Sequence, residues 1–468
     1  MATTTGEPQT FRRALVLMTA TSFLVPAAGV LTAPILARAL DTAGRGELAA
    51  AQAPAALMLA VATLGLPDAL TYHLAKRPGR TRAALSWGSL ITSALGIVCV
   101  LVTWAALPFL SAGTRELGRL ILLAAALTIP ALVVGVFRGA ATGRQMWGAV
   151  AAERLLTTLA RVGGLVALWS FGELTVLTAL LVGALTPVVA GVAYWRLLLP
   201  VPADAGQRAS STELVKDLTS FGSKVWVGSI ASMLLARVGQ IFMVPLSSVE
   251  DLGLYTVAST ISDVPLIVAL AIQNALFGVN SKTTDAAQLT ATTRATLLVG
   301  FGGCAALGVT LPLWIGPLFG EAFTAATVPT LMLLLSAVLC IPGLLAASGV
   351  AAWGRPGLRS LGLGITLVVN TVAFLVLVPL FGVYGACWTS LLNNVVLTTF
   401  MVIAASRVMG VPIGDFIAVR RGDLQRVCAE FLRLLRRLVP GRLRREHSAP
   451  TSVHSSDEVP VCAEDPRG

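Results

Sequence analysis

Long apolar runs recur along the whole chain, and they constrain its fold more than any other feature. The clearest example begins at Thr219 and ends at Asn280, where two runs flank the short acidic segment SSVEDLGLY. Each run exceeds the roughly 20 residues that a helix needs to cross the hydrocarbon core of a bilayer. Only 12% of the 468 residues are charged, against about 25% in a soluble domain. The chain is therefore predicted to be an all-α, polytopic membrane protein.

The apolar runs predict about twelve transmembrane helices. Their expected bounds are residues 14–37, 47–75, 84–110, 117–141, 149–171, 174–199, 219–246, 252–280, 294–316, 325–353, 358–380 and 382–406. Most Lys and Arg residues fall in alternate connections, and the opposite set holds only Arg38, Arg45, Arg115 and Arg119. By the positive-inside rule, this asymmetry predicts that both termini lie in the cytoplasm.

The two halves of the chain resemble each other. RGAATGRQ at residues 138–145 is similar to SGVAAWGRP at residues 348–356, and related features lie near 210 positions apart. An internal duplication of six helices explains this spacing. It predicts an N-terminal lobe at residues 1–199, a cytoplasmic linker at 200–218 and a C-terminal lobe at 219–407. Because six is even, both copies would insert in the same orientation.

The end of the chain has a different character. Apolar residues recur there at intervals of three and four, at Leu424, Val427, Phe431, Leu434 and Leu438, with arginines between them. This pattern predicts that residues 408–446 form a basic amphipathic helix on anionic membrane lipids. A solvated helix bound to a partner protein is the alternative interpretation. The composition of residues 447–468 predicts disorder.

Several motifs together resemble one membrane protein family. They are ARALDTAGRGELAAA with TLGLPDALTYHLAK, then LARVGQIFMVPLSSVEDLGLYTVAST, then VAAWGRP with LVPLFGVYGACWTSLLNN. In this order and spacing they resemble bacterial polysaccharide flippases of the O-antigen type, a family in the superfamily of multidrug and toxic-compound extrusion transporters and lipid II flippases. The resemblance implies two six-helix lobes around a central cavity. It also implies a plasma membrane transporter that moves polyprenyl-diphosphate-linked oligosaccharide to the outer leaflet.

The sequence departs from this family at one informative position. Many members carry an acidic residue shortly after the arginine of the seventh helix, whereas this chain has Arg237-Val238-Gly239-Gln240. Without that acid, Arg237 is expected to have no local charge partner. Any cation coupling would then depend on another residue.

Charged residues inside a membrane span cost roughly 2.5–3.5 kcal/mol at the centre of a helix, so each one needs an explanation. Arg237 and Arg161 are candidates to bind the diphosphate of the cargo, because arginine keeps its charge and bonds phosphate in a bidentate manner. Structural ion pairs or snorkelling side chains are the alternative. Lys224, near the inner end of its span, is a candidate to guide an anionic head group.

Other polar residues of the spans also have two interpretations. Asp263, Asp68 and His73 are candidates for proton or cation coupling, with hydration or backbone bonding as the structural alternative. Amides suit sugar hydroxyls because they both donate and accept hydrogen bonds. The amide candidates for substrate binding are Gln240, Asn274 and Asn370. Amides also join helices in lipid, and this is the favoured role for any single one.

The sequence argues against several other functions. It has no phosphate-binding glycine loop, no nucleotide motif, no metal cluster and no paired cysteine spacing, so no cofactor, metal or enzymatic activity is expected. The net charge of +11 follows from topology rather than from nucleic-acid binding. A drug or cation antiporter of the same fold stays an alternative, as does, less favoured, a membrane polysaccharide polymerase or ligase. Such a polymerase and glycosyltransferases are also the expected protein partners.

Overall fold

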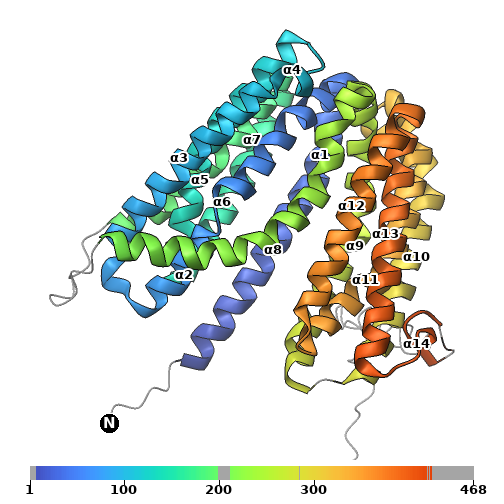
Figure 1. Cartoon of the computed structure of the whole chain (residues 1–468). Coiled ribbons are helices and arrows are strands. Elements are labelled where there is room, and N and C mark those ends of the chain that lie inside the picture. Colours follow the sequence, from blue (N-terminus) through green and yellow to red (C-terminus); the bar gives the residue numbers. More distant parts are fainter. Residues whose placement is uncertain (1–6, 199–210, 284, 419, 421, 424–468) are drawn as a thin grey trace, which may run out of the picture. The chain divides into compact units, whose positions relative to one another are not determined.

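The computed structural model describes residues 7–198, 211–283, 285–418, 420 and 422–423 (Figure 1). Every regular element in these residues is a helix. The first half contains α1 (Glu7–Ala62), α2 (Leu66–Lys76), η1 (Pro78–Arg80), α3 (Thr81–Ala105), α4 (Leu107–Leu110), α5 (Arg115–Gly143), α6 (Trp147–Ser170), α7 (Val176–Ala190) and η2 (Gly191–Leu198). The second half contains α8 (Ser211–Leu246), α9 (Val249–Thr283), α10 (Ala286–Phe319), η3 (Glu321–Ala326), α11 (Thr327–Ala352), α12 (Pro356–Phe381), α13 (Val383–Met409) and α14 (Gly414–Ile417).

The helices confirm an all-α protein that passes through the membrane many times. Nine segments of the described chain are long and apolar enough to span a bilayer, and one of them, Pro26–Lys76, covers two predicted spans. Helix α6 is not among these nine, because it carries Glu153, Arg154 and Arg161 within its 24 residues. Each of the twelve predicted spans corresponds to helical structure in the described residues.

The breaks in the first two spans differ from the prediction. The expected turn around residues 38–46 is helical and is interrupted only at Asp41, whose φ of 57° is non-helical. The expected single span 47–75 is instead divided where α1 ends, because Leu64 and Gly65 both have positive φ angles. Periodicity cannot locate such breaks, since one left-handed residue redirects a helix without changing its apolar pattern.

Two glycines make reciprocal close contacts between the first and second halves. A Cβ at Gly46 would lie 1.9 Å from the carbonyl oxygen of Val249, and a Cβ at Gly253 would lie 2.1 Å from that of Thr42. Gly46 and Gly253 are 207 positions apart, and so are Thr42 and Val249. Equivalent positions therefore exchange equivalent contacts, as a duplicated chain requires. This agrees with the repeat near 210 residues, while the proposed lobe bounds stay a prediction.

In the second half, helices α9 to α13 run side by side (Figure 1). Close approach of their backbones and hydrogen bonds from side-chain amides hold them together. A Cβ at Gly343 of α11 would lie 2.5 Å from Thr398 Oγ1 of α13. The amide of Gln273 on α9 donates to the carbonyl of Leu344 at 2.9 Å. The amide of Asn394 on α13 donates to Ser336 Oγ at 2.8 Å. Small residues and such bonds drive helix association in lipid, so these two amides join helices.

The helices belong to one compact unit, which extends to residue 419, and the described residues 420 and 422–423 fall in a second unit. Helix α13 ends at Met409, where Gly410 adopts a left-handed conformation with φ of 67°. Helix α14 follows, and its Phe416 is fully buried. The residues that predict an amphipathic helix, 424–438, and the predicted disordered segment, 447–468, lie outside the described residues.

Candidate functional site

Arg237 on α8 is the first charged residue of interest, and its side chain is half-buried. Its Nη1 donates to Oε1 of Gln240 at 2.6 Å. The two residues are three positions apart, which places them on one face of the helix. The Nε atom of Arg237 is buried and has no hydrogen-bond partner within the described residues. The guanidinium is therefore held by one amide and keeps donor capacity to spare.

An acidic residue of the next helix lies near this arginine. Asp263 on α9 is close enough for its charge to attract that of Arg237. Its side chain is exposed although it lies in a spanning segment, and such a carboxylate requires water or a polar cavity rather than lipid. The expectation that Arg237 has no local charge partner is therefore wrong. The acid comes from α9, 26 positions away along the chain, where sequence spacing could not reveal it.

The glycine that replaces the family's acid has a packing role. A Cβ at Gly239 would lie 3.2 Å from Cε2 of Phe374 on α12. This is tighter than an ordinary van der Waals contact, and Phe374 is only 2% exposed. A carboxylate at position 239 would therefore displace the buried ring.

Arg161 lies at a second site, in a cavity of about 290 Å³ among α1, α5, α6 and α7. Its polar lining within the described residues consists of Gln52, Thr128 and Arg161. Arg45 of α1 is near enough that the positive charge of Arg161 repels it. The sequence places Arg45 in an exposed turn, but its side chain is only 9% exposed. Its position seven residues before Gln52, on the same helix face, is the signal that could have identified it.

A third arginine forms a close ion pair with a carboxylate. Arg138 of α5 donates from Nε and Nη2 to the two carboxylate oxygens of Glu153 on α6, at 3.1 and 2.8 Å. Tyr194 of η2 donates to the same carboxylate at 3.2 Å, and Thr157 donates to it at 3.3 Å. Glu153 is 1% exposed. This cluster joins three elements, α5, α6 and η2. Its four hydrogen bonds use the acceptor capacity of the carboxylate, so none is left for a ligand.

Among the described side chains, none of the other predicted residues shares a printed hydrogen bond with Arg237, which bonds Gln240. Asn370 is buried on α12, whereas Asn274 is exposed on α9. Asp68 is exposed in the first turn of α2, and His73 in the last turn packs edge-on against Tyr72 with ring centroids 5.5 Å apart. The side chain of Lys224 lies outside the described residues. Only Gln240, among the predicted amides, contacts a predicted arginine in the described part of the chain.

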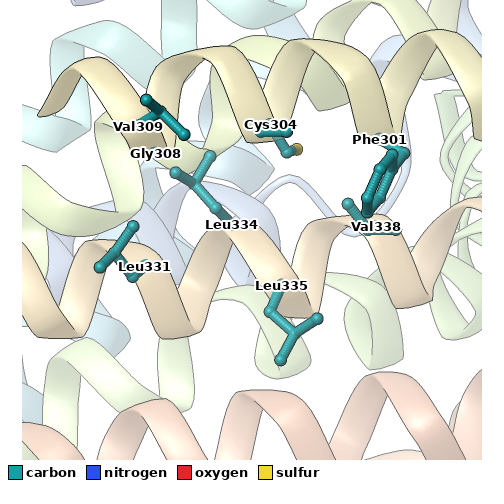
Figure 2. A pocket seen from close by; sticks show the side chains of 9 residues that line it. Phe301, Cys304, Gly308, Val309, Leu331, Leu334, Leu335 and Val338 are labelled. Atoms are coloured by element: carbon teal, nitrogen blue, oxygen red, sulfur yellow. The ribbon is translucent and has the colours of Figure 1, made fainter.

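A groove between α10 and α11, with a volume of about 420 Å³, is the contrasting case (Figure 2). Phe301, Cys304, Leu331, Leu334 and Val338 are among its lining residues, which are all apolar. Gly308 makes room in it, since a Cβ there would lie 3.0 Å from Leu331 Cδ2. A surface of this composition on two spanning helices fits lipid chains and offers no group to recognise a polar ligand.

The described residues contain no group of three or more His, Cys, Asp or Glu side chains that could hold a metal ion. The four cysteines within them, Cys99, Cys304, Cys340 and Cys387, are free. The polar groups near the two arginine sites are guanidinium, carboxylate, hydroxyl and amide groups. Such groups bind and release anions and polar head groups.

Known proteins resemble this chain in sequence and in fold. Residues 11–284, more than half of the chain, match the model of the family described as polysaccharide biosynthesis protein. No curated protein matches the chain. The fold is similar to that of the lipid II flippase MurJ in an inward closed conformation, with a TM-score of 0.69, 12% identity, and coverage of 89% of this chain and 93% of that one.

Two further solved structures share the fold. One is a multidrug resistance MATE family transporter of the MOP superfamily in an inward-facing conformation, with a TM-score of 0.63, 16% identity, and coverage of 81% of this chain and 94% of that one. The other is a MOP superfamily transporter from Pyrococcus furiosus whose binding pocket is described as of reverse polarity. It has a TM-score of 0.57 and 15% identity, and covers 87% of this chain and 99% of that one.

Proposed function

Since the chain belongs to the polysaccharide biosynthesis protein family, we propose that it flips a polyprenyl-diphosphate-linked oligosaccharide from the inner to the outer leaflet of a bacterial plasma membrane. Both termini would lie in the cytoplasm, as the distribution of Lys and Arg predicts. The cargo would come from glycosyltransferases on the inner side and pass to a polymerase on the outer side. A fold shared with the lipid II flippase MurJ and with MATE transporters supports transport over catalysis.

The observation that supports this proposal is that the charge of Arg237 is only partly compensated by the described residues around it. A diphosphate cannot cross hydrocarbon with its charge exposed, so a carrier must offer it a cationic partner inside the membrane. Arg237 is held in place by Gln240 and has a buried Nε donor without a partner in the described residues. Its attraction to Asp263 is electrostatic rather than a close ion pair within bonding distance. An incoming phosphate can therefore compete for the guanidinium.

Asp263 can promote release of the cargo phosphate from Arg237. While the cargo phosphate occupies Arg237, the carboxylate of Asp263 is repelled by it, and binding of a proton or cation at Asp263 relieves this repulsion. When the proton or cation leaves, the carboxylate attracts Arg237 again, and the binding of the phosphate to Arg237 is weakened. Asp68, His73, Lys224, Asn274, Asn370 and Arg161 remain candidate contacts elsewhere on the path.

A flipping assay in proteoliposomes tests the proposal. The probe is a fluorescent N-acetylglucosamine on a short polyprenyl diphosphate, and dithionite quenches the label in the outer leaflet only. The wild-type protein should make the inner pool accessible, and Arg237→Ala should lower the rate about a hundredfold, since a charged hydrogen bond contributes roughly 1.5–3 kcal/mol. Arg237→Lys should keep part of the rate, because the charge survives without the bidentate geometry.

The control is Arg119→Ala, which removes an equal charge from an exposed side chain of α5. It should flip the probe at the wild-type rate. Normal flipping by well-inserted Arg237→Ala protein would remove Arg237 from the site. Failure of the wild-type protein to flip the probe would reject the proposed cargo.

One observation favours a second candidate function, a drug or cation antiporter. Asp263 is an exposed carboxylate within a spanning segment, and such a group binds cationic substrates or protons. An antiporter would lose export of an organic cation in Asp263→Asn, whereas flipping of the polyprenyl probe would be absent in the wild type as well.

A further inference from the structure

The cavity among α1, α5, α6 and α7 is lined by polar groups with unused hydrogen-bonding capacity. Arg161 of α6 and Gln52 of α1 both line it. Neither side chain makes a hydrogen bond or an ion pair within the described residues. Thr128 of α5 also lines it and donates to the carbonyl of Ala124 at 2.8 Å, so its oxygen can still accept a hydrogen bond. A guanidinium, an amide and a hydroxyl from three helices therefore border one space.

The size of this cavity suits one small ring. Its volume of about 290 Å³ lies just below the range of about 300–1,000 Å³ that is usual for small-molecule sites. Most of the remaining wall consists of alanine and leucine, with Gly183 of α7 among them. A Cβ at Gly183 would lie 3.3 Å from Nε2 of Gln52, so a larger residue there would take up part of the space. The cavity therefore has room for a single sugar ring and not for a phosphate together with its polyprenyl chain.

The charge of the cavity favours an acidic ligand. Arg161 keeps its proton in a protein, and the cavity lining contains no Asp or Glu in the described part of the chain. An unpaired charge in a membrane span is unfavourable, so the guanidinium gains most from a ligand that brings a counter-charge. A carboxylate matches it well, because two parallel N–H groups can bond the two oxygens of a planar carboxylate.

The other two polar groups favour a sugar as the carrier of that carboxylate. The amide of Gln52 can both donate to and accept from a hydroxyl, and Thr128 can accept from one. A sugar ring presents several hydroxyls around its edge and C–H groups on its faces, which fit the alanine and leucine wall. A simple carboxylic acid would leave the amide and the hydroxyl without partners.

We propose that this cavity binds a carboxylate-bearing sugar ring, a uronic acid, of the transported saccharide. The inference rests on the proposed function, since the ring belongs to the cargo whose diphosphate Arg237 binds. Arg161 pairs with the carboxylate, and Gln52 and Thr128 bond the ring hydroxyls. The cargo is thereby an acidic oligosaccharide, and a neutral ring is disfavoured because it leaves Arg161 unpaired.

Binding of free sugars tests the cavity without transport. The probes are sodium glucuronate, glucose and inorganic phosphate, and ligand-detected NMR measures their binding to the purified full-length protein in detergent. The wild type should bind glucuronate at least about tenfold more tightly than glucose or phosphate. Arg161→Gln should weaken glucuronate binding roughly ten- to hundredfold, as expected for the loss of a charged hydrogen bond, and should leave glucose binding unchanged.

Matched variants separate the site from general effects of charge and folding. Arg119→Gln removes an equal charge from an exposed side chain and should bind glucuronate as the wild type does. Gln52→Leu and Gly183→Val keep every charge, and each should weaken glucuronate binding, the first by removing the amide and the second by filling the space beside it. Thermal scans establish that each variant is folded, and these two keep the test decisive if Arg161→Gln is not.

A flipping assay with two probes connects the cavity to transport. Both probes carry the same label and polyprenyl diphosphate, one with N-acetylglucosamine alone and one with a glucuronate attached to it. Arg161→Gln should slow flipping of the acidic probe about tenfold at low probe concentration and leave the neutral probe unchanged. Arg237→Ala should slow both, because both contain the diphosphate.

Three results would overturn the uronic acid site. They are wild-type binding of glucuronate no tighter than that of glucose, glucuronate binding by folded Arg161→Gln equal to that of the wild type, and tighter binding of phosphate than of glucuronate that is lost in Arg161→Gln. Failure of the wild type to flip either probe would instead reject the proposed function. Glucuronate binding that depends on Arg161 would then still establish the acidic-sugar site.

Discussion

Two arginine sites on α6 show how differently one kind of side chain can be treated within a single helix bundle. At one, Glu153 of α6 accepts two hydrogen bonds from Arg138 and one each from Tyr194 and Thr157. At the other, Arg161 of the same helix repels Arg45 beside an open cavity. A saturated cluster joins helices, and an unsaturated pair has binding capacity left. Arg237 is intermediate between these cases. It donates one hydrogen bond to the Gln240 amide, and the Asp263 carboxylate acts on it at longer range.

The largest effect is expected at the saturated cluster. Arg138→Leu would leave the Glu153 carboxylate, 1% exposed, without its counter-charge, which should cost about 3–5 kcal/mol. Glu153→Leu should cost less, because the Arg138 side chain is 41% exposed and can reach polar surroundings. Thermal unfolding in detergent measures both. The double variant should recover much of the loss, and a single Arg138→Leu variant as stable as the wild type would show that the cluster does not hold the helices.

An intermediate effect is expected where the acid of the family is restored. Gly239→Asp would bring a carboxylate to α8 near Arg237, but its Cβ would press on Phe374 at 3.2 Å. Overpacking of this kind costs roughly 1–3 kcal/mol. A double-mutant cycle with Phe374→Leu measures how much of the loss comes from this contact. Strictly additive effects would mean that the ring does not explain the glycine.

The smallest effect, and of opposite sign, is expected at the repelling pair. Arg161→Leu removes a like charge from the neighbourhood of Arg45, whose side chain is buried, and should therefore stabilise the protein by roughly 1 kcal/mol. The unfolding temperature in detergent measures this change. A clear destabilisation by Arg161→Leu would show that its charge is already met.

Much of the path to the candidate sites can be followed from the sequence. Charged side chains are so costly in a span that Arg161, Arg237 and Asp263 are identifiable as functional candidates from their positions alone. The hydrogen bond from Arg237 to the Gln240 amide also follows from helical spacing, since the two residues are three positions apart. Arg45 cannot be identified in this way, because the apolar pattern around it is the same whether the chain turns there or continues as a helix.

The sequence by itself determined the helical spans, the membrane environment and the repeat of about 210 residues, because each depends on local composition or on a comparison of the chain with itself. Only the tertiary structure decided which charges meet. The charge of Asp263 on α9 acts on Arg237 on α8. The charge of Arg161 acts on Arg45, although more than a hundred residues separate them along the chain. Such encounters depend on where helices break and how closely glycines such as Gly46 and Gly253 let them approach. Helical periodicity carries no record of these distances, since it repeats every 3.6 residues whatever lies beside the helix.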